Sequence, residues 1–275
     1  MIQLDYELLD SGDGYRLERF GNNIVARPDS TIIWRPRSPR SNWNFDAILV
    51  NSRWQTKKSF KEKWIVSCDD FSLGLKLGRS PNIGVFPEQL ENWKWINKVI
   101  KGSNKQPEIL NLFGYTGGST LAAAVSGAKV THVDSAKSII SWFLSNKILS
   151  NLDTLPMRYI VEDCIKFVNR ELRRGNRYDA IILDPPAFGK GSSGEVFKFE
   201  KDVPVLLELC KKILKPKPLF VLLNSYSMGY SPYVIGNLLE DFFPNQEIEC
   251  GDLLLEEVKR ERVLQCGVFA RFKVS

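Results

Sequence analysis

Two hydrophobic patterns alternate along most of this chain. Short runs that are apolar at nearly every position predict strands buried on both faces, and longer stretches with apolar residues every three or four positions predict helices. The predicted strands are 109–113, 129–134, 157–162, 179–184 and 218–224, and the helices that follow them are 117–127, 136–149, 163–174, 202–214 and 232–243. This alternation predicts a doubly wound α/β domain around a mostly parallel sheet.

The pattern changes at both ends of that domain. Two further strands are predicted near 246–256 and 262–273, with only a short connection between them. Consecutive strands with a short connection form antiparallel pairs, so the sheet should have seven strands and an antiparallel edge. A further helix is predicted at 86–100, with Pro87 in its first turn.

The first 80 residues have no helical periodicity. They contain short apolar or aromatic runs at 24–26, 31–34, 47–50 and 64–66, separated by Gly, Asn, Asp, Pro and Ser. Such punctuation predicts strands and turns. We therefore expect a small antiparallel β module at 1–80 and the α/β domain at 81–275.

Composition narrows the class of protein. With 43% hydrophobic residues among 275, the chain can bury a core and is not disordered. One His and five dispersed Cys predict no metal site and favour a reducing compartment. No run of 18 apolar residues and no signal-peptide core are present, so we expect a cytoplasmic protein without membrane attachment.

A glycine-rich turn follows the first predicted strand of the α/β domain. Residues 113–118 read Phe-Gly-Tyr-Thr-Gly-Gly. Gly114, Gly117 and Gly118 allow a tight turn and a close backbone approach to a ligand, and Thr116 can cap the following helix. This spacing differs from the G-x-G-x-x-G of dinucleotide enzymes. Taken alone, the turn is compatible with a cofactor site or with a plain connection.

Asp134 favours the cofactor site. It ends the second strand, 20 residues beyond Gly114, where an acidic residue can accept hydrogen bonds from ribose hydroxyls. His132 lies two residues earlier on the same face, and a buried core role is favoured over a catalytic one. Asp163 follows the third strand and either caps the next helix or accepts from an adenine amino group. Cys164 can form a small apolar wall beside it.

The sequence Asp184-Pro185-Pro186-Ala187-Phe188 follows the fourth strand. The prolines lack backbone donors and stiffen the turn, which leaves carbonyl groups and the Asp184 carboxylate free to accept hydrogen bonds. Phe188 can stack on a flat base. This turn suits a substrate that presents an amine to a methyl donor, although a rigid loop without chemistry is the alternative.

Together these motifs resemble the class I methyltransferases that use S-adenosylmethionine. Within that class, the closer resemblance is to the branch of bacterial 23S ribosomal RNA large-subunit methyltransferases. It rests on residues 111–118 (Asn-Leu-Phe-Gly-Tyr-Thr-Gly-Gly), on Val133-Asp134-Ser135-Ala136, on the Asp-Pro-Pro-x-Phe motif at 184–188 and on 84–89 (Gly-Val-Phe-Pro-Glu-Gln). It covers about residues 80–230 well and implies a Rossmann-like fold.

The resemblance also implies roles for these residues. Phe86 and Gln89 would border the methionine and sulfonium end of the cofactor, and Gly114, Tyr115, Thr116 and Gly117 would hold the methionine moiety. Asp134 with Ser135 would bind the ribose, and Asp163 with Cys164 the adenine. Asp184 would lie where donor meets acceptor, so that Asp184, Pro185 and Phe188 would form the catalytic turn.

One departure from this branch concerns the chemistry. Relatives that methylate carbon 5 of a pyrimidine carry a nucleophilic cysteine after the fifth strand, because that carbon must first be activated by covalent addition. Here the stretch reads Asn-Ser-Tyr-Ser-Met-Gly at 224–229, and Tyr226 cannot replace a thiolate. We therefore expect direct transfer, to nitrogen or to an activated oxygen, by alignment of donor and acceptor.

The charge favours an RNA acceptor. Residues 27–63 contain nine basic and three acidic residues, which equals the net charge of +6 of the whole chain, and Trp34, Trp43 and Trp54 are interleaved with them. Cations for phosphates and aromatic rings for unstacked bases are typical of RNA binding. A solvated β face, with the tryptophans in a small core, is the alternative. Methyl transfer to a protein or small molecule, and a non-catalytic RNA-binding assembly factor, also remain open.

Overall fold

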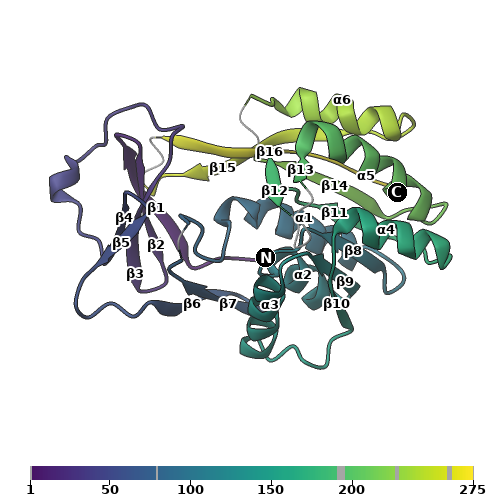
Figure 1. Ribbon diagram of the computed structural model, residues 1–275, viewed down its shortest axis with the longest axis horizontal. Helices are drawn as coiled ribbons and strands as arrows, with labels where there is room; N and C mark the ends of the chain where they lie inside the picture. The colour runs from purple at the N-terminus through teal and green to yellow at the C-terminus, as the bar shows by residue number, and fades with distance from the viewer. Residues whose placement is uncertain (1, 79, 191–195, 227–228, 259–261, 275) are drawn as a thin grey trace. The chain divides into compact units, whose positions relative to one another are not determined.

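The computed structural model describes residues 2–78, 80–190, 196–226, 229–258 and 262–274. The chain divides into two compact units (Figure 1). The first contains residues 1–90 and 254–265, and the second contains 91–253 and 266–275. The first unit therefore reaches ten residues beyond the predicted boundary at 80 and includes a segment from near the C-terminus, which the sequence pattern does not indicate.

A seven-stranded sheet forms the centre of the second unit, in the order β10-β9-β8-β11-β14-β16-β15. Its strands are β8 (Glu108–Leu112), β9 (Lys129–Asp134), β10 (Met157–Val161), β11 (Ala180–Leu183), β14 (Phe220–Ser225), β15 (Glu249–Glu256) and β16 (Val263–Lys273). The first five are parallel, and β16 pairs antiparallel with β14. The predicted fold is confirmed, with β15 at the edge beyond the antiparallel β16.

Six α-helices of the described residues cover this sheet. They are α1 (Leu90–Lys101), α2 (Gly118–Val125), α3 (Lys137–Leu149), α4 (Cys164–Arg173), α5 (Phe199–Ile213) and α6 (Pro232–Phe242). Alternate strand residues enter two cores: Leu110 and Leu223 pack with α4, α5 and α6, whereas Ile109 and Leu222 pack with α1 and α2. The central strands are apolar throughout because both of their faces are buried.

The first unit contains a five-stranded sheet in the order β1-β2-β3-β4-β5 and a separate hairpin, β6–β7. The strands are β1 (Tyr6–Gly12), β2 (Tyr15–Phe20), β3 (Asn23–Pro28), β4 (Ala47–Val50), β5 (Arg53–Thr56), β6 (Lys63–Cys68) and β7 (Phe71–Lys76). The β4–β5 turn places Asn51 and Ser52 in the left-handed region, as a two-residue hairpin turn requires. The predicted β module is present.

Three details of the structure differ from the sequence pattern. The pair β3–β4 is parallel rather than antiparallel, because a long connection separates the two strands. The apolar run at 31–34 is not a strand: Asp29 accepts hydrogen bonds from the backbone and hydroxyl of Thr31, and Ile33 is exposed. The stretch after Asp184 contains two short strands, β12 (Phe188–Lys190) and β13 (Val196–Lys198), instead of only a loop.

Among the described residues, no helix combines the length and the apolar character needed to cross a membrane.

Candidate functional site

The glycine-rich turn lies at the carboxyl end of β8, at the centre of the parallel sheet. Phe113, Tyr115 and Gly117 all have positive φ, at 57°, 49° and 96°. Two of these residues are not glycine, and non-glycine residues in this region carry a local conformational cost that is concentrated at functional sites. The turn is fixed by hydrogen bonds from the Gly114 N–H to Val133 O and from the Gly117 N–H to Gly114 O.

The glycines are required mainly by close packing. A Cβ on Gly114 would lie 2.3 Å from the His132 ring, one on Gly117 would lie 2.3 Å from Phe143, and one on Gly118 would lie 2.4 Å from Trp93. Gly114 itself does not have a positive φ, so its neighbour and not its backbone conformation excludes a side chain. The turn therefore rests directly on three rings from β9, α3 and α1.

His132 is the buried support beneath Gly114. It stacks on Phe143 with ring centroids 4.1 Å apart, and burial lowers its pKa to about 3. The Asn111 amide donates to Thr120 Oγ1, whose own hydrogen is then available to His132 Nδ1 at 2.8 Å. The imidazole is therefore neutral, which agrees with the core role and not with acid–base catalysis.

Asp134 ends β9 beside this turn. Its Oδ2 accepts from the Tyr115 N–H at 3.1 Å and its Oδ1 accepts from the Ala136 N–H at 3.0 Å. Burial raises the pKa of Asp134, opposed by these backbone hydrogen bonds. A carboxylate has about four acceptor positions, so Asp134 keeps acceptor capacity for a ligand. This half-buried acceptor beside a close-packed turn fits the vicinal hydroxyls of a cofactor ribose.

The residues around Asp134 and the turn are also fixed. Asn146 of α3 donates to the Thr116 carbonyl at 2.9 Å, and Tyr115 lies near Trp142 with ring centroids 6.1 Å apart. Thr116 is buried, and Gly117 rather than Thr116 occupies the N-cap position of α2. Ser135 directly follows Asp134 and is half-buried. The predicted residues Gly114 to Gly117, Asp134 and Ser135 thus lie together.

Asp163 and Cys164 begin α4, next to the end of β9. The backbone joins the two places, because the Glu162 N–H donates to Asp134 O at 3.1 Å. Asp163 is the N-cap of α4, and its Oδ1 accepts from the Lys166 N–H at 2.9 Å. The capping role is confirmed, whereas the role toward adenine stays a prediction. Cys164 is buried in the core, and that burial raises its thiol pKa well above the ordinary value.

The Asp184 turn lies at the same edge of the sheet. The Asp184 N–H donates to Leu112 O at 3.3 Å, which connects it to the last residue of β8. Pro185 is buried, whereas Phe188 is 55% exposed at the start of the β12–β13 hairpin. Phe197 of that hairpin packs against Phe113 with ring centroids 5.0 Å apart. The Asp184 turn and the glycine-rich turn are therefore neighbours.

Phe86 and Gln89 belong to the first unit, around the short 3-10 helix η2 (Pro87–Gln89) that precedes α1. Gln89 is buried and Phe86 is half-buried. Their predicted roles at the cofactor stay predictions. Between them, Glu88 is only 4% exposed, and burial raises its pKa despite the charges of Arg16 and Arg27.

Several parts of the site were not predicted from the sequence. Several side chains contact the site from separate elements: Trp93, Phe143, Asn146 and the Asn111–Thr120 pair. Nothing in the sequence around them distinguishes these residues from ordinary core residues. The only sequence signal for these contacts is the presence of Gly114, Gly117 and Gly118, because a glycine in such a place can indicate that another group lies close to the backbone.

A series of hydrogen-bonded polar side chains in the second unit was also not predicted from the sequence. Arg271 of β16 pairs with Glu249 and donates to Asn92 Oδ1 at 2.9 Å. The Asn92 amide then donates to Asn224 Oδ1 at 3.0 Å. This series fixes the orientation of the fully buried Asn224 side chain at the carboxyl end of β14. Among the described residues, nothing accepts a hydrogen bond from its Nδ2.

Within the part of the chain that the structure describes, no group of three or more His, Cys, Asp or Glu side chains could hold a metal ion.

Comparisons with known proteins identify the family. Residues 50–231 match the model of a family described as S-adenosylmethionine-dependent methyltransferase. A crystal structure of a SAM-dependent methyltransferase from Agrobacterium tumefaciens is 37% identical, covers 98% of this chain and 90% of its own, and has a TM-score of 0.93. A methyltransferase structure from Streptococcus mutans, 21% identical with a TM-score of 0.75, shares the fold over 98% of this chain and 75% of its own.

Curated relatives include the ribosomal RNA large subunit methyltransferase K/L of Pseudoalteromonas translucida. It is 33% identical over 204 residues, which are 74% of this chain but 27% of the relative. The chain thus spans about a quarter of the length of such relatives. The family match over most of the chain, together with the glycine-rich turn and Asp134, leads to one conclusion: the chain belongs to the S-adenosylmethionine-dependent methyltransferase family.

Proposed function

We propose that this methyltransferase transfers a methyl group to a nitrogen atom of RNA, with ribosomal RNA as the substrate. Two observations support this acceptor: relatives named as ribosomal RNA large subunit methyltransferases, and exposed cations in the first unit. Such a substrate would be met in the cytoplasm.

The cofactor would be held by the residues around the glycine-rich turn. S-adenosylmethionine supplies an electrophilic methyl group on sulfur. Asp134 would accept from the ribose hydroxyls with the acceptor capacity that its backbone hydrogen bonds leave available. The turn from Gly114 to Gly117 would border the methionine moiety, with Phe86 and Gln89 at its sulfonium end. Asp163 and Cys164 would lie at the adenine.

The acceptor would be oriented by the Asp184 turn. Its carboxylate would accept a hydrogen bond from the attacking amine, which directs the nitrogen lone pair at the methyl carbon. Pro185 has no backbone N–H to compete for this acceptor. Phe188, which is more than half exposed, would stack on the base that carries the amine. The observation that carries this proposal is the backbone contact between Asp184 and Leu112, which places both turns at one edge of the sheet.

A covalent route through a thiolate is not part of this proposal. Cys164 and Cys210 are buried, and burial raises the pKa of both thiols. Cys250 and Cys266 are half-buried. Replacing Cys250 and Cys266 together by Ala should therefore leave methyl transfer at the level of the unchanged protein. Loss of turnover in that variant, with cofactor binding kept, would contradict direct transfer.

The first unit is proposed to contact the RNA, with a smaller set of residues than the sequence suggests. Arg27 is buried in an ion pair with Glu18 at 2.7 Å, and Trp43 is buried with its indole N–H on Asp10. Trp34 and Trp54 also donate their indole N–H groups within the unit. The exposed cations that make no ion pair among the described residues remain for phosphates: Arg35, Arg53, Lys58, Lys61 and Lys63.

The test combines two variants with analysis of modified nucleosides. Asp134→Ala should abolish binding of S-adenosylmethionine in calorimetry, because a half-buried ribose acceptor is lost. Asp184→Ala should keep binding and lose turnover by about a hundredfold or more, the size expected when a positioned catalytic group is removed.

The acceptor is identified by mass spectrometry of digested RNA from cells with and without the gene. One methylated nucleoside should vanish without it and return with the unchanged protein but not with Asp184→Ala. If no nucleoside changes while the purified protein binds S-adenosylmethionine, the acceptor is a protein or small molecule and the RNA proposal fails.

A further inference from the structure

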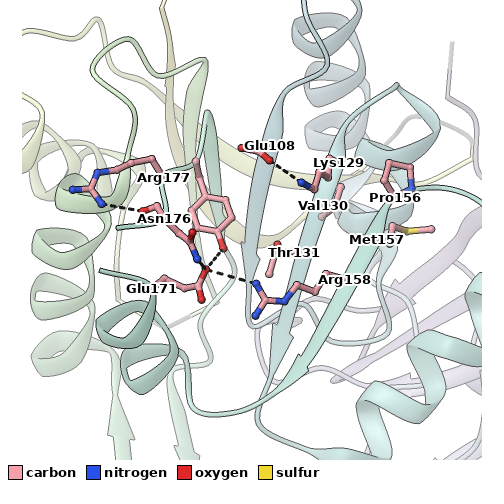
Figure 2. Close-up of a pocket in the computed structure, with 11 residues that line it drawn as sticks. Glu108, Lys129, Val130, Thr131, Pro156, Met157, Arg158, Glu171, Asn176 and Arg177 are labelled. Atoms are coloured by element: carbon pink, nitrogen blue, oxygen red, sulfur yellow. Dashed lines mark hydrogen bonds and ion pairs between the residues drawn. The ribbon is translucent and has the colours of Figure 1, made fainter. Parts of the chain in front are cut away.

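A cavity lies in the second unit, at the amino ends of the parallel strands. The glycine-rich turn lies at their carboxyl ends. Its volume is about 380 Å³, within the range of small-molecule sites. Its walls include the first residues of three parallel strands: Glu108 of β8, Lys129 of β9 and Met157 of β10 (Figure 2). The glycine-rich turn and Asp184 follow the last residues of their strands, and Asp134 is the last residue of β9. About five residues at 3.3 Å each, or roughly 17 Å, therefore separate the cavity from the proposed methyl-transfer site.

The cavity has two chemically different sides. Figure 2 shows Val130, Pro156 and Met157 on one side and Asn176 and Arg177 on the other. The first side combines the apolar Pro156 and Met157 with the cations Lys129 and Arg158. The second side is polar, so the cavity suits a ligand with both a flat apolar part and a charged part.

The carboxylates of this region already have partners. Glu171 is fully buried, and it accepts from Tyr178 Oη and Asn176 Nδ2 at 2.8 Å each. Although burial opposes ionisation, these hydrogen bonds hold the pKa of Glu171 below its ordinary value. Glu108 accepts from Lys129 at 2.9 Å and from Lys215 at 3.2 Å. Neither carboxylate is left to attract a cationic ligand.

The cations at the cavity retain more capacity. The Arg158 guanidinium lies 3.7 Å from Glu171, beyond hydrogen-bond distance, and its side chain is 46% exposed. Arg177 donates from Nη1 to the Asn176 carbonyl at 2.9 Å and is otherwise exposed. Lys129 is 57% exposed and gives one of its three hydrogens to Glu108. Three cations with spare donors thus surround carboxylates that are already satisfied.

We propose that this cavity binds the phosphate group of a nucleotide, with Arg158 and Arg177 on the phosphate and the base against Pro156 and Met157. Guanidinium groups match phosphate oxygens in charge and geometry. The nucleotide is either a free nucleoside monophosphate or one residue of a bound RNA chain. The RNA source rests on the proposed function, whereas the free nucleotide does not.

The experiment uses the full chain and three probes: adenosine 5′-monophosphate, adenosine, and a labelled single-stranded RNA. The variant is Arg158→Gln/Arg177→Gln. The matched control is Lys98→Gln/Lys211→Gln, which removes the same charge from exposed positions on α1 and α5 that do not line the cavity. S-adenosylmethionine affinity should be equal in all three proteins, because the changed side chains lie away from the cofactor site. A cooperative thermal unfolding transition shows that each variant is folded.

For a free nucleotide, adenosine 5′-monophosphate should bind at least tenfold more tightly than adenosine. The Arg158→Gln/Arg177→Gln variant should lose this preference and the control should keep it. For an RNA residue, the slope of log K against log salt should become shallower by about 0.7 in the variant, the value for the loss of one phosphate contact. The proposal is overturned if neither probe distinguishes the variant from the control. Loss of methyl transfer or cofactor binding in other variants would affect only the proposed function.

Discussion

At the scale of single residues, Gly114 is the position where the turn tolerates least change. A methyl group there would lie 2.3 Å from the His132 ring, which is held by the stacked Phe143 and by Thr120. The neighbour cannot move away without disturbing α3 or α2.

We predict that Gly114→Ala lowers the free energy of unfolding by about 1–3 kcal/mol, as overpacking of a close-packed site does. The same change should weaken S-adenosylmethionine binding. Gly102→Ala is the matched control, since no atom other than its chain neighbours would lie nearer than 3.4 Å to the added Cβ. Chemical denaturation and calorimetry measure both effects, and equal behaviour of the two variants would contradict this reading of Gly114.

His132 should make stability depend on pH. Burial lowers its pKa to about 3 in the folded protein, against 6.5 for the ordinary group. Below pH 6.5 the unfolded chain binds this proton and the folded protein does not, so stability falls by up to about 1.4 kcal/mol for each pH unit between 6.5 and 3. His132→Gln should be less stable at pH 7 but should lack this part of the slope. Denaturation at several pH values tests it, and parallel curves for the two proteins would disprove it.

At the scale of elements, the residue between β10 and α4 has one observed role and one proposed role. Asp163 caps α4 through Lys166, and its second oxygen has no other hydrogen bond among those that the structure describes. A cap needs only a short side-chain acceptor, whereas contact with an adenine amino group needs the longer reach of Asp.

Two substitutions separate these functions. Asp163→Ala should lower the free energy of unfolding by about 1 kcal/mol, the usual cost of a lost cap. Asp163→Ser should keep that stability, because Ser is also a good cap, but should weaken S-adenosylmethionine binding. Thermal unfolding and calorimetry on the three proteins distinguish the roles. Full cofactor affinity in Asp163→Ser would limit the residue to capping.

The elements themselves were largely predictable from the sequence, because each parallel strand is buried on both faces and therefore apolar at nearly every position. The glycine-rich turn and Asp134 were also predictable, because each is specified by residues that are close together in the sequence. The turn is a run of consecutive residues, and Asp134 ends a strand that is itself predictable. The β12–β13 hairpin was not, since three-residue strands have no measurable periodicity. Long-range contacts such as Gly114 with His132 follow from the strand register, which no single segment specifies.

At the scale of the whole molecule, the net charge of residues 27–63 does not show how many of their cations are exposed and unpaired. Nine basic residues between 27 and 63 look equivalent in the sequence, but Arg27 is fully paired with Glu18, Arg37 pairs with Glu257 and Lys57 pairs with Asp46. Burial and pairing depend on the tertiary fold, so sequence charge overestimates the surface that can meet RNA.

We predict that Arg53→Gln/Lys58→Gln/Lys61→Gln/Lys63→Gln weakens RNA binding, because these exposed cations make no ion pair among the described residues. With one phosphate contact each, the slope of log K against log salt should become shallower by about 3. Fluorescence anisotropy at several salt concentrations measures it, with Lys98→Gln/Lys211→Gln as control. S-adenosylmethionine binding should not change. An unaltered slope would remove the first unit from the RNA interface.

The segment 254–265 has a consequence for how the protein is made. In the first unit, Glu257 accepts from Ser11 Oγ at 2.6 Å and from Arg37, and the Val258 N–H donates to Leu8 O. A ribosome therefore releases residues 1–90 long before it synthesises their partners, and the first unit cannot be completed until nearly the whole chain has emerged. Contacts so distant in sequence slow folding. Until then, β1 lacks its backbone contacts with Glu257 and Val258. During that interval this edge of the N-terminal sheet is open to chaperones.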